Sequence, residues 1–259
     1  MKLPIYQIDA FANRRFEGNP AAVVPLQAWL STEVMQSIAQ ENNLSETVFF
    51  VPQDRGYEIR WFTPNQEVKL CGHATLAAAF VLFNVLDYRD DVIEFDSLSG
   101  RLTVSKAGDL LTLDFPAQVP EPCELPDALQ QALGGQVRAC FGNEDYLVVF
   151  ENEADVAALN PDYSLLQQLQ LRGVIVTAPS SNYDFVSRFF APKYGIPEDP
   201  VTGSAFTQLA PYWAERLQKN NLSAKQISPR GGQVMCELVH DRVLISGRGV
   251  QYLEGSIEI

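Results

Sequence analysis

Residues 60–64 (RWFTP) and residues 188–192 (RFFAP) share one pattern: arginine, an aromatic residue, phenylalanine, one variable residue and proline. Eleven residues after each arginine, at Cys71 and at Asp199, a polar turn that contains glycine begins. Each turn leads into an apolar segment with helical spacing. Two unrelated strand-to-helix turns would not be expected to share both the motif and the offset. The repeat therefore indicates an internal duplication with two similar lobes.

The segment between the repeats separates these lobes. Short apolar runs with strand character and a few helices occur on both sides of it, and residues 116–122 (PAQVPEP) contain three prolines. Such a proline cluster is typical of a crossing between domains. We therefore expect an α+β fold with an N-terminal lobe of residues 1–117 and a C-terminal lobe of residues 118–259. The expected helix at 72–86 is apolar on all sides, which predicts a buried helix.

The composition argues against several classes of function. The chain has 19 basic and 32 acidic side chains, a formal charge of −13. Such a chain repels polyphosphate and anionic lipid, so we expect neither nucleic-acid nor membrane partners. No apolar run approaches the roughly 18 residues of a membrane-spanning helix. Four dispersed cysteines without a CxxC pair favour a reduced, cytoplasmic protein.

The two polar turns are candidate anion sites. They comprise residues 71–75 (CGHAT) and residues 199–205 (DPVTGSA). Each places small residues at a helix start, where unpaired N–H groups and the helix dipole can hold an anion. Two such turns that face one cleft between the lobes could bind a substrate carboxylate and stabilise the charge that develops as a proton leaves carbon.

Glu46 is the candidate base. It lies in residues 43–50 (NLSETVFF), directly before a run of apolar residues. A carboxylate in this position is either solvated at a strand edge or partly desolvated at a cleft, and the segment alone favours the solvated case. A desolvated carboxylate would suit general acid–base catalysis.

These segments carry a family resemblance that covers essentially the whole chain. Residues 18–24 (GNPAAVV), 43–50, 71–75 and 199–205 resemble the signature segments of the phenazine-biosynthesis PhzF-like family. The resemblance implies a fold like that of diaminopimelate epimerase, with a mixed, barrel-like sheet around a central helix in each lobe. It also implies a homodimeric isomerase that needs neither a metal nor an organic cofactor.

The resemblance also assigns roles to individual residues. Glu46 matches the proton-shuttling glutamate, and His73 and Asp199 match the polar pair that assists it. The expected residues around a small carboxylate substrate are Asn19, Cys71, Gly72, Gly203 and Ser204. Phe206 stands where the family often has histidine, so the substrate of the phenazine enzymes is not transferred to this chain.

Two alternatives stay open at this point. One is an amino-acid racemase or epimerase in which Cys71 acts with an acidic partner, either Asp199 or Glu46. A helix N-terminus is expected to lower the pKa of that thiol, but the second turn offers no matching cysteine. The other alternative is a catalytically inactive homologue that binds a small molecule. A metal centre is not expected, because the chain has only two histidines and no HxxxH pattern.

Overall fold

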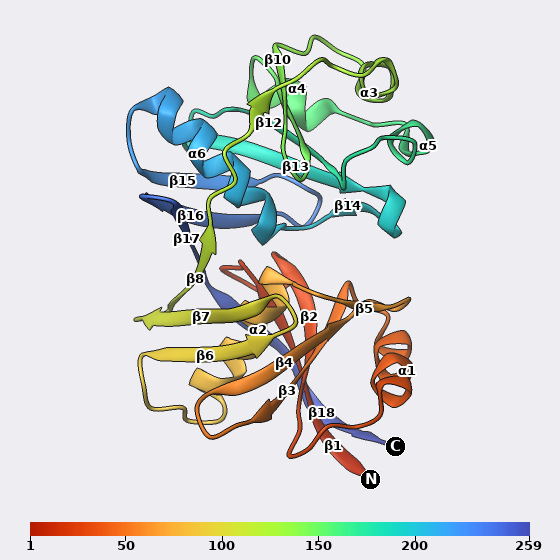
Figure 1. The fold of residues 1–259 in the computed structure, drawn as a ribbon, viewed down its shortest axis with the longest axis vertical. Helices are drawn as coiled ribbons and strands as arrows, with labels where there is room; N and C mark the ends of the chain where they lie inside the picture. The colour runs from red at the N-terminus through yellow and green to blue at the C-terminus, as the bar shows by residue number, and fades with distance from the viewer. The chain divides into compact units, whose positions relative to one another are not determined.

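The computed structural model describes residues 1–259 throughout and divides into two units (Figure 1). Unit 1 comprises residues 1–114 and 246–259, and unit 2 comprises residues 115–245. The C-terminal residues thus join the first unit, whereas the expected lobes divide once, after residue 117. The reason is strand pairing: β18 (Gly249–Glu258) runs antiparallel along β1 (Lys2–Ala10), so both chain ends belong to unit 1.

Unit 1 combines a mixed sheet with two helices. Besides β1 and β18, its elements are β2 (Asn19–Pro25), α1 (Thr32–Asn42), β3 (Glu46–Pro52), β4 (Tyr57–Phe62), β5 (Glu67–Val68), α2 (Gly72–Asn84), β6 (Val92–Ser97), β7 (Gly100–Ala107) and β8 (Leu110–Pro116). Strand β8 crosses from unit 1 into unit 2, and β17 (Arg242–Gly247) returns.

Helix α2 is the core of unit 1. It contacts β1, β2, β3, β7 and β18, and almost all of its side chains are buried. This agrees with its sequence, which is apolar on every side of the helix. Helix α1 instead covers the sheet with one face, through Met35, Ile38 and Ala39.

The strands of unit 2 also combine parallel and antiparallel pairs, and the unit has its own central helix. Its elements are β9 (Glu121–Pro122), α3 (Asp127–Leu133), β10 (Ala139–Gly142), β11 (Tyr146–Val149), α4 (Glu153–Ala158), α5 (Tyr163–Leu166), β12 (Val174–Pro179), β13 (Phe185–Ala191), the 3-10 turn η1 (Pro192–Tyr194), β14 (Ile196–Asp199), the 3-10 turn η2 (Gly203–Ala205), α6 (Phe206–Leu217), β15 (Asn221–Gln226) and β16 (Gly232–Val239). Helix α6 packs on β15 and β16, and its residues 206–214 are all buried. None of the helices in either unit combines the length and apolar character needed to cross a bilayer.

Strand pairing establishes the internal duplication. In unit 1, β2 pairs parallel with β3, β3 antiparallel with β4, and β4 parallel with β6. In unit 2, β11 pairs parallel with β12, β12 antiparallel with β13, and β13 parallel with β15. The buried helix in each unit follows the short strand β5 or β14. The expected α+β fold with two similar lobes, each a mixed sheet around a helix, is confirmed.

The arginines of the repeated motif make the same ion pair in both units. Arg60 on β4 donates through Nε and Nη2 to the two carboxylate oxygens of Glu67, at 2.7 and 2.8 Å. Arg188 on β13 binds Glu198 in the same way, also at 2.7 and 2.8 Å. Such a fork-to-fork pair fixes the short strand β5 or β14 against its neighbour. The repeated motif therefore marks an arginine–glutamate ion pair that precedes the buried helix in each unit. We call the pairs Arg60–Glu67 and Arg188–Glu198 the two clamps.

The two clamps differ in burial, which predicts different costs on removal. The Arg188 side chain is 10% exposed, and it also donates to the carbonyl oxygens of Val156 and Leu159. Arg188→Ala should destabilise the fold by about 3–5 kcal/mol, because Glu198 is left as an unpaired, largely buried charge. Arg60→Ala should cost about 1–2 kcal/mol, since the Arg60 side chain is 20% exposed. Urea denaturation of both variants measures the difference, and equal costs would contradict this account of the clamps.

Candidate active site

Glu46 is the first residue of β3, and the neighbouring strand brings Asn19 near it. Glu46 lies opposite Ala21 in the parallel β2–β3 pair, and Asn19 begins β2. The turn before Asn19 requires Gly18, whose φ is +70° and whose Cβ, if present, would lie 2.2 Å from the carbonyl oxygen of Ala10. Because β2 and β3 are parallel, their first residues lie side by side at the same end of the two strands.

Helix α2 begins at the same end of these strands. Cys71 is its N-cap residue and Gly72 its first residue. The side chain of His73 points back to the strand starts: its Nε2 lies 3.0 Å from Oε2 of Glu46, and its Nδ1 lies 3.2 Å from the amide nitrogen of Asn19. The exposed fractions are 0% for Asn19, 5% for His73 and 7% for Glu46. Five of the eight predicted site residues therefore gather in unit 1.

The surroundings of His73 favour its protonated form. Burial acts to lower the pKa of His73, but the charges of Cys71 and Glu46 and the hydrogen bonds to both outweigh it and raise the pKa well above 6.5. We attribute the increase to Glu46, because Cys71 is a thiol at neutral pH. The imidazolium donates from both ring nitrogens.

Cys71 does not have the lowered pKa expected from its place at a helix start. Its Sγ lies 3.5 Å from Nδ1 of His73. Burial raises the pKa of Cys71 to about 11, and the negative charge of Glu46 adds to the increase. The desolvation of the thiolate outweighs the effect of the histidine, so the lowered pKa that the racemase alternative expects of Cys71 is not found.

The other three predicted residues, Asp199, Gly203 and Ser204, lie in unit 2. Asp199 ends β14 and is 6% exposed. Its Oδ2 accepts a hydrogen bond of 2.5 Å from Oγ1 of Thr202. Its carbonyl oxygen accepts from the side chains of Gln226 and Ser228. Asp199 is therefore held rigidly just before the turn that contains Gly203 and Ser204.

The strand register corrects the correspondence between the two turns. Trp61, next to Arg60, pairs with Val68, and Phe189, next to Arg188, pairs with Asp199. Asp199 is thus equivalent to Val68, and the N-cap Cys71 is equivalent to the N-cap Thr202. The equal offset from the arginines is misleading, because η1 adds residues between β13 and β14 in the second repeat. The partner of Cys71 in the duplication is a hydroxyl.

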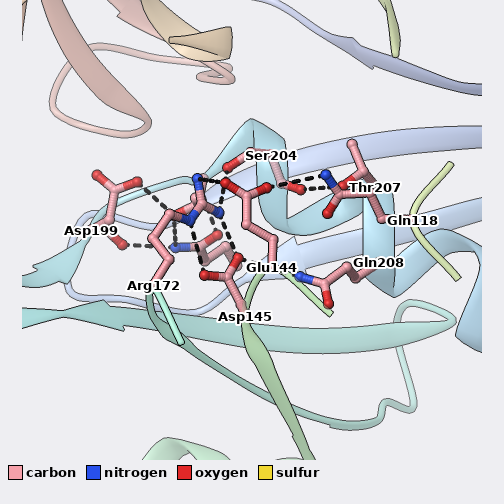
Figure 2. Close-up of polar contacts among 10 residues, drawn as sticks. Gln118, Glu144, Asp145, Arg172, Asp199, Ser204, Thr207 and Gln208 are labelled. Carbon is pink, nitrogen blue, oxygen red and sulfur yellow. Dashed lines mark hydrogen bonds and ion pairs between the residues drawn. The ribbon is translucent and has the colours of Figure 1, made fainter. Parts of the chain in front are cut away.

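A polar cluster around Arg172 was not predicted from the sequence (Figure 2). Arg172 donates to both carboxylate oxygens of Asp145, at 2.9 and 2.5 Å, and from Nη2 to Oγ of Ser204 at 3.0 Å. Glu144 lies 3.2 Å from Nη1. Burial raises the pKa of Asp145, although Arg172 acts in the opposite direction. Asp145 and Arg172 precede the paired strands β11 and β12, so only knowledge of that parallel register could have revealed them.

Glu46, Cys71 and His73 are also the residues that could hold a metal ion. Their ligand atoms lie within 4.8 Å of one another, and all three residues are buried. Binding would need a thiolate and a neutral imidazole. The raised pKa of Cys71 and of His73 opposes both requirements. The arrangement suits proton transfer better than metal coordination.

Comparison with known proteins gives consistent relationships. The family described as phenazine biosynthesis-like proteins (PhzC-PhzF) matches residues 8–255. An isomerase from Pseudomonas aeruginosa, itself named as uncharacterized, is 53% identical over 259 residues that cover 100% of both chains. The crystal structure of a PhzF-family phenazine biosynthesis protein from Enterococcus faecalis has a TM-score of 0.98 and 47% identity, and covers 100% of both chains.

The fold extends to a more distant protein. A hydroxyproline epimerase from Agrobacterium vitis has a TM-score of 0.62 and 10% identity, with 99% of this chain and 92% of that chain covered. At this identity, the similarity concerns the fold alone.

The Glu46–His73 pair predicts a specific titration. Ring-nitrogen NMR shifts should show His73 as an imidazolium above pH 6.5, and Glu46→Gln should lower the pKa of His73 by removing the opposing charge. A His73 pKa that does not change in this variant would contradict the assigned cause.

The same pair should link stability to pH. The unfolded chain loses the His73 proton near pH 6.5, whereas the folded protein keeps it to higher pH. The contribution to stability is therefore complete below pH 6.5 and is lost as the pH rises through the folded-state pKa. Urea denaturation of the wild type and of His73→Gln should give a difference in unfolding free energy that decreases over that rise. A difference that grows with pH would contradict this sign.

Proposed function

Because the chain belongs to the phenazine biosynthesis-like (PhzC-PhzF) family, we propose that it is an isomerase of a small carboxylate substrate in which Glu46 takes a proton from carbon and returns it. The observation that carries the proposal is the buried pair of Glu46 and His73, with Nε2 of His73 3.0 Å from Oε2 of Glu46. The isomerase name of the P. aeruginosa relative supports the reaction class.

The pair suits proton transfer at carbon for two physical reasons. The contact with His73 holds the carboxylate of Glu46 in one orientation, which a base needs for efficient transfer. Both side chains are less than a tenth exposed, so bulk water has little access to a proton on Glu46. A carboxylate in such a place can take a proton from one carbon and return it to another on the same face before exchange with solvent occurs.

His73 and Asp199 are proposed to assist this transfer. The imidazolium offers positive charge beside Glu46, which stabilises negative charge that develops on the substrate. Asp199 is held by Thr202, and its role rests on the family resemblance. Gly203 and Ser204 are proposed to bind the substrate carboxylate, together with Asn19, Cys71 and Gly72.

A racemase that uses Cys71 as its base is the second candidate. The contact between Cys71 and His73 favours it, because a histidine in its neutral form can accept the proton of a thiol. The raised pKa of Cys71 and the equivalence of Cys71 with Thr202 argue against it. A thiol that titrates near pH 11 is a poor base at neutral pH.

Incubation with small amino and hydroxy acids in deuterated water tests the proposed function. A double-bond shift in which the substrate hydrogen is largely retained supports the single-carboxylate isomerase. Deuterium at carbon with inverted configuration supports the racemase. Saturable binding without either signal would contradict both and support a binding protein.

Glu46→Gln should abolish turnover, by at least about 10³-fold, because the amide cannot accept the proton. Small carboxylates should still bind, since the variant keeps the shape of the side chain. Glu41→Gln, which changes an exposed residue of α1, is the matched control and should leave turnover unchanged. Near-normal turnover of Glu46→Gln, with CD spectra matching those of the wild type, would remove Glu46 from the mechanism.

Cys71→Ser should keep most of the activity, within about tenfold, because the thiol packs in unit 1 and is protonated at neutral pH. Steady-state kinetics with the substrate found in deuterated water measure this. A loss of about 10³-fold or more would support a thiol acid or base instead.

A further inference from the structure

The guanidinium of Arg172 is held by the carboxylates of Asp145 and Glu144. The carboxylate of Asp145 is 0% exposed and binds Arg172 through both oxygens. Glu144 contacts the same guanidinium from a more exposed position. Figure 2 shows these two carboxylates and Asp199 around Arg172. The positive charge is therefore balanced within unit 2, so Arg172 is not a free counter-ion for a substrate.

The remaining bond of Arg172 acts on Ser204. Nη2 donates to Oγ of Ser204 at 3.0 Å, and a guanidinium has no acceptor. Ser204 can therefore not donate its hydroxyl proton back to Arg172. One lone pair of Oγ is engaged by Arg172, and this charge-assisted bond polarises the hydroxyl and strengthens it as a donor toward a further acceptor.

The duplication gives independent support for this reading of the contact. Counted from the equivalent residues Glu67 and Glu198, His73 corresponds to Ser204. The registers of β4 on β3 and of β13 on β12 place Glu46 in correspondence with Gly173. The same kind of contact therefore occurs in each unit, between a side chain at or just before the start of a strand and the second residue after an N-cap. In unit 1 it joins Glu46 to His73, and in unit 2 it joins Arg172 to Ser204.

Unit 2 uses Arg172 rather than the next residue because Gly173 has no room for a side chain. A Cβ on Gly173 would lie 2.6 Å from Cζ of Phe189. Arg172 stacks over that ring, with its Cζ 5.5 Å from the ring centre. Phe189 therefore both excludes a carboxylate like Glu46 from this position and supports the arginine that reaches Ser204.

We propose that Asp145 and Arg172 are positioning residues that hold the Ser204 hydroxyl as a hydrogen-bond donor, so that the protein selects a carboxylate over the corresponding carboxamide. The inference rests on the proposed function for its carboxylate substrate. A carboxylate oxygen is charged and accepts a stronger hydrogen bond than the neutral oxygen of a carboxamide. A polarised donor hydroxyl therefore stabilises the carboxylate more than the carboxamide.

The test compares affinities for propionate, lactate and benzoate with those for propionamide, lactamide and benzamide, by ligand-observed NMR titration. In the wild type, at least one carboxylate should bind about tenfold more tightly than its amide, the ratio expected for a hydrogen bond to a charged group. Ser204→Ala should lower this ratio by about the same factor. The amide affinity should change by less than about threefold.

The double variant Arg172→Met/Asp145→Asn tests the positioning role. It removes the guanidinium without leaving a buried, unpaired carboxylate. Without the guanidinium, the Ser204 hydroxyl is a weaker donor and is not held in one orientation, so the carboxylate-to-amide ratio should decrease about tenfold while amide binding persists. A purely structural role would instead weaken both ligands equally. Glu144→Gln keeps the Asp145–Arg172 pair and is the control, with the wild-type ratio expected.

Absence of a carboxylate preference in the wild type, or a ratio unchanged in Ser204→Ala and in the double variant, would overturn the inference. The outcome is separate from that of the proposed function. Exchange of deuterium at carbon with an unchanged ratio contradicts only the positioning role. The predicted ratios without any proton transfer contradict only the isomerase.

Discussion

The contact between Glu46 and His73 is the interaction on which the rest of the structure depends. Two ionisable groups that are almost fully buried stay together only where each compensates the desolvation of the other. The fold provides this by placing the start of β3 next to the start of α2. The charge of Glu46 acts to raise the pKa of His73, and it adds to the burial that raises the pKa of Cys71, whereas His73 acts to lower the pKa of Cys71. It therefore separates carboxylate chemistry from thiol chemistry within one small cluster.

The duplication explains why the protein has two similar helix starts with different side chains. The clamps Arg60–Glu67 and Arg188–Glu198 fix the same geometry before each buried helix. Within that shared frame, unit 1 presents an ionisable pair, whereas unit 2 presents a hydroxyl that is oriented by a neutralised arginine. In the proposed function, unit 1 moves the proton, and in the further inference the Ser204 hydroxyl of unit 2 donates to the ligand carboxylate.

Local patterns in the sequence predicted the fold, whereas the family resemblance assigned Glu46 and His73 to one site, because the segment around Glu46 alone favours a solvated carboxylate. The repeated arginine motif, the apolar α2 segment and the glycine-containing turns all lie within short stretches of chain. The pairing of β18 with β1 and the cluster of Asp145 and Arg172 depend on contacts between distant segments, which no local pattern reports. The pKa of Cys71 has a related cause: burial, set by the packed unit, outweighs the local effect of the helix start that the racemase alternative invoked.

The most direct test of the central claim is a single-turnover experiment in ordinary water, with a substrate that carries deuterium at the carbon that loses its proton. If Glu46 carries that atom within a site that excludes bulk water, most of the deuterium should appear at the second carbon of the product. Glu46→Gln should form no product on the same timescale. Complete loss of the label to solvent, or transfer that persists in Glu46→Gln, would contradict proton transfer by a single buried carboxylate.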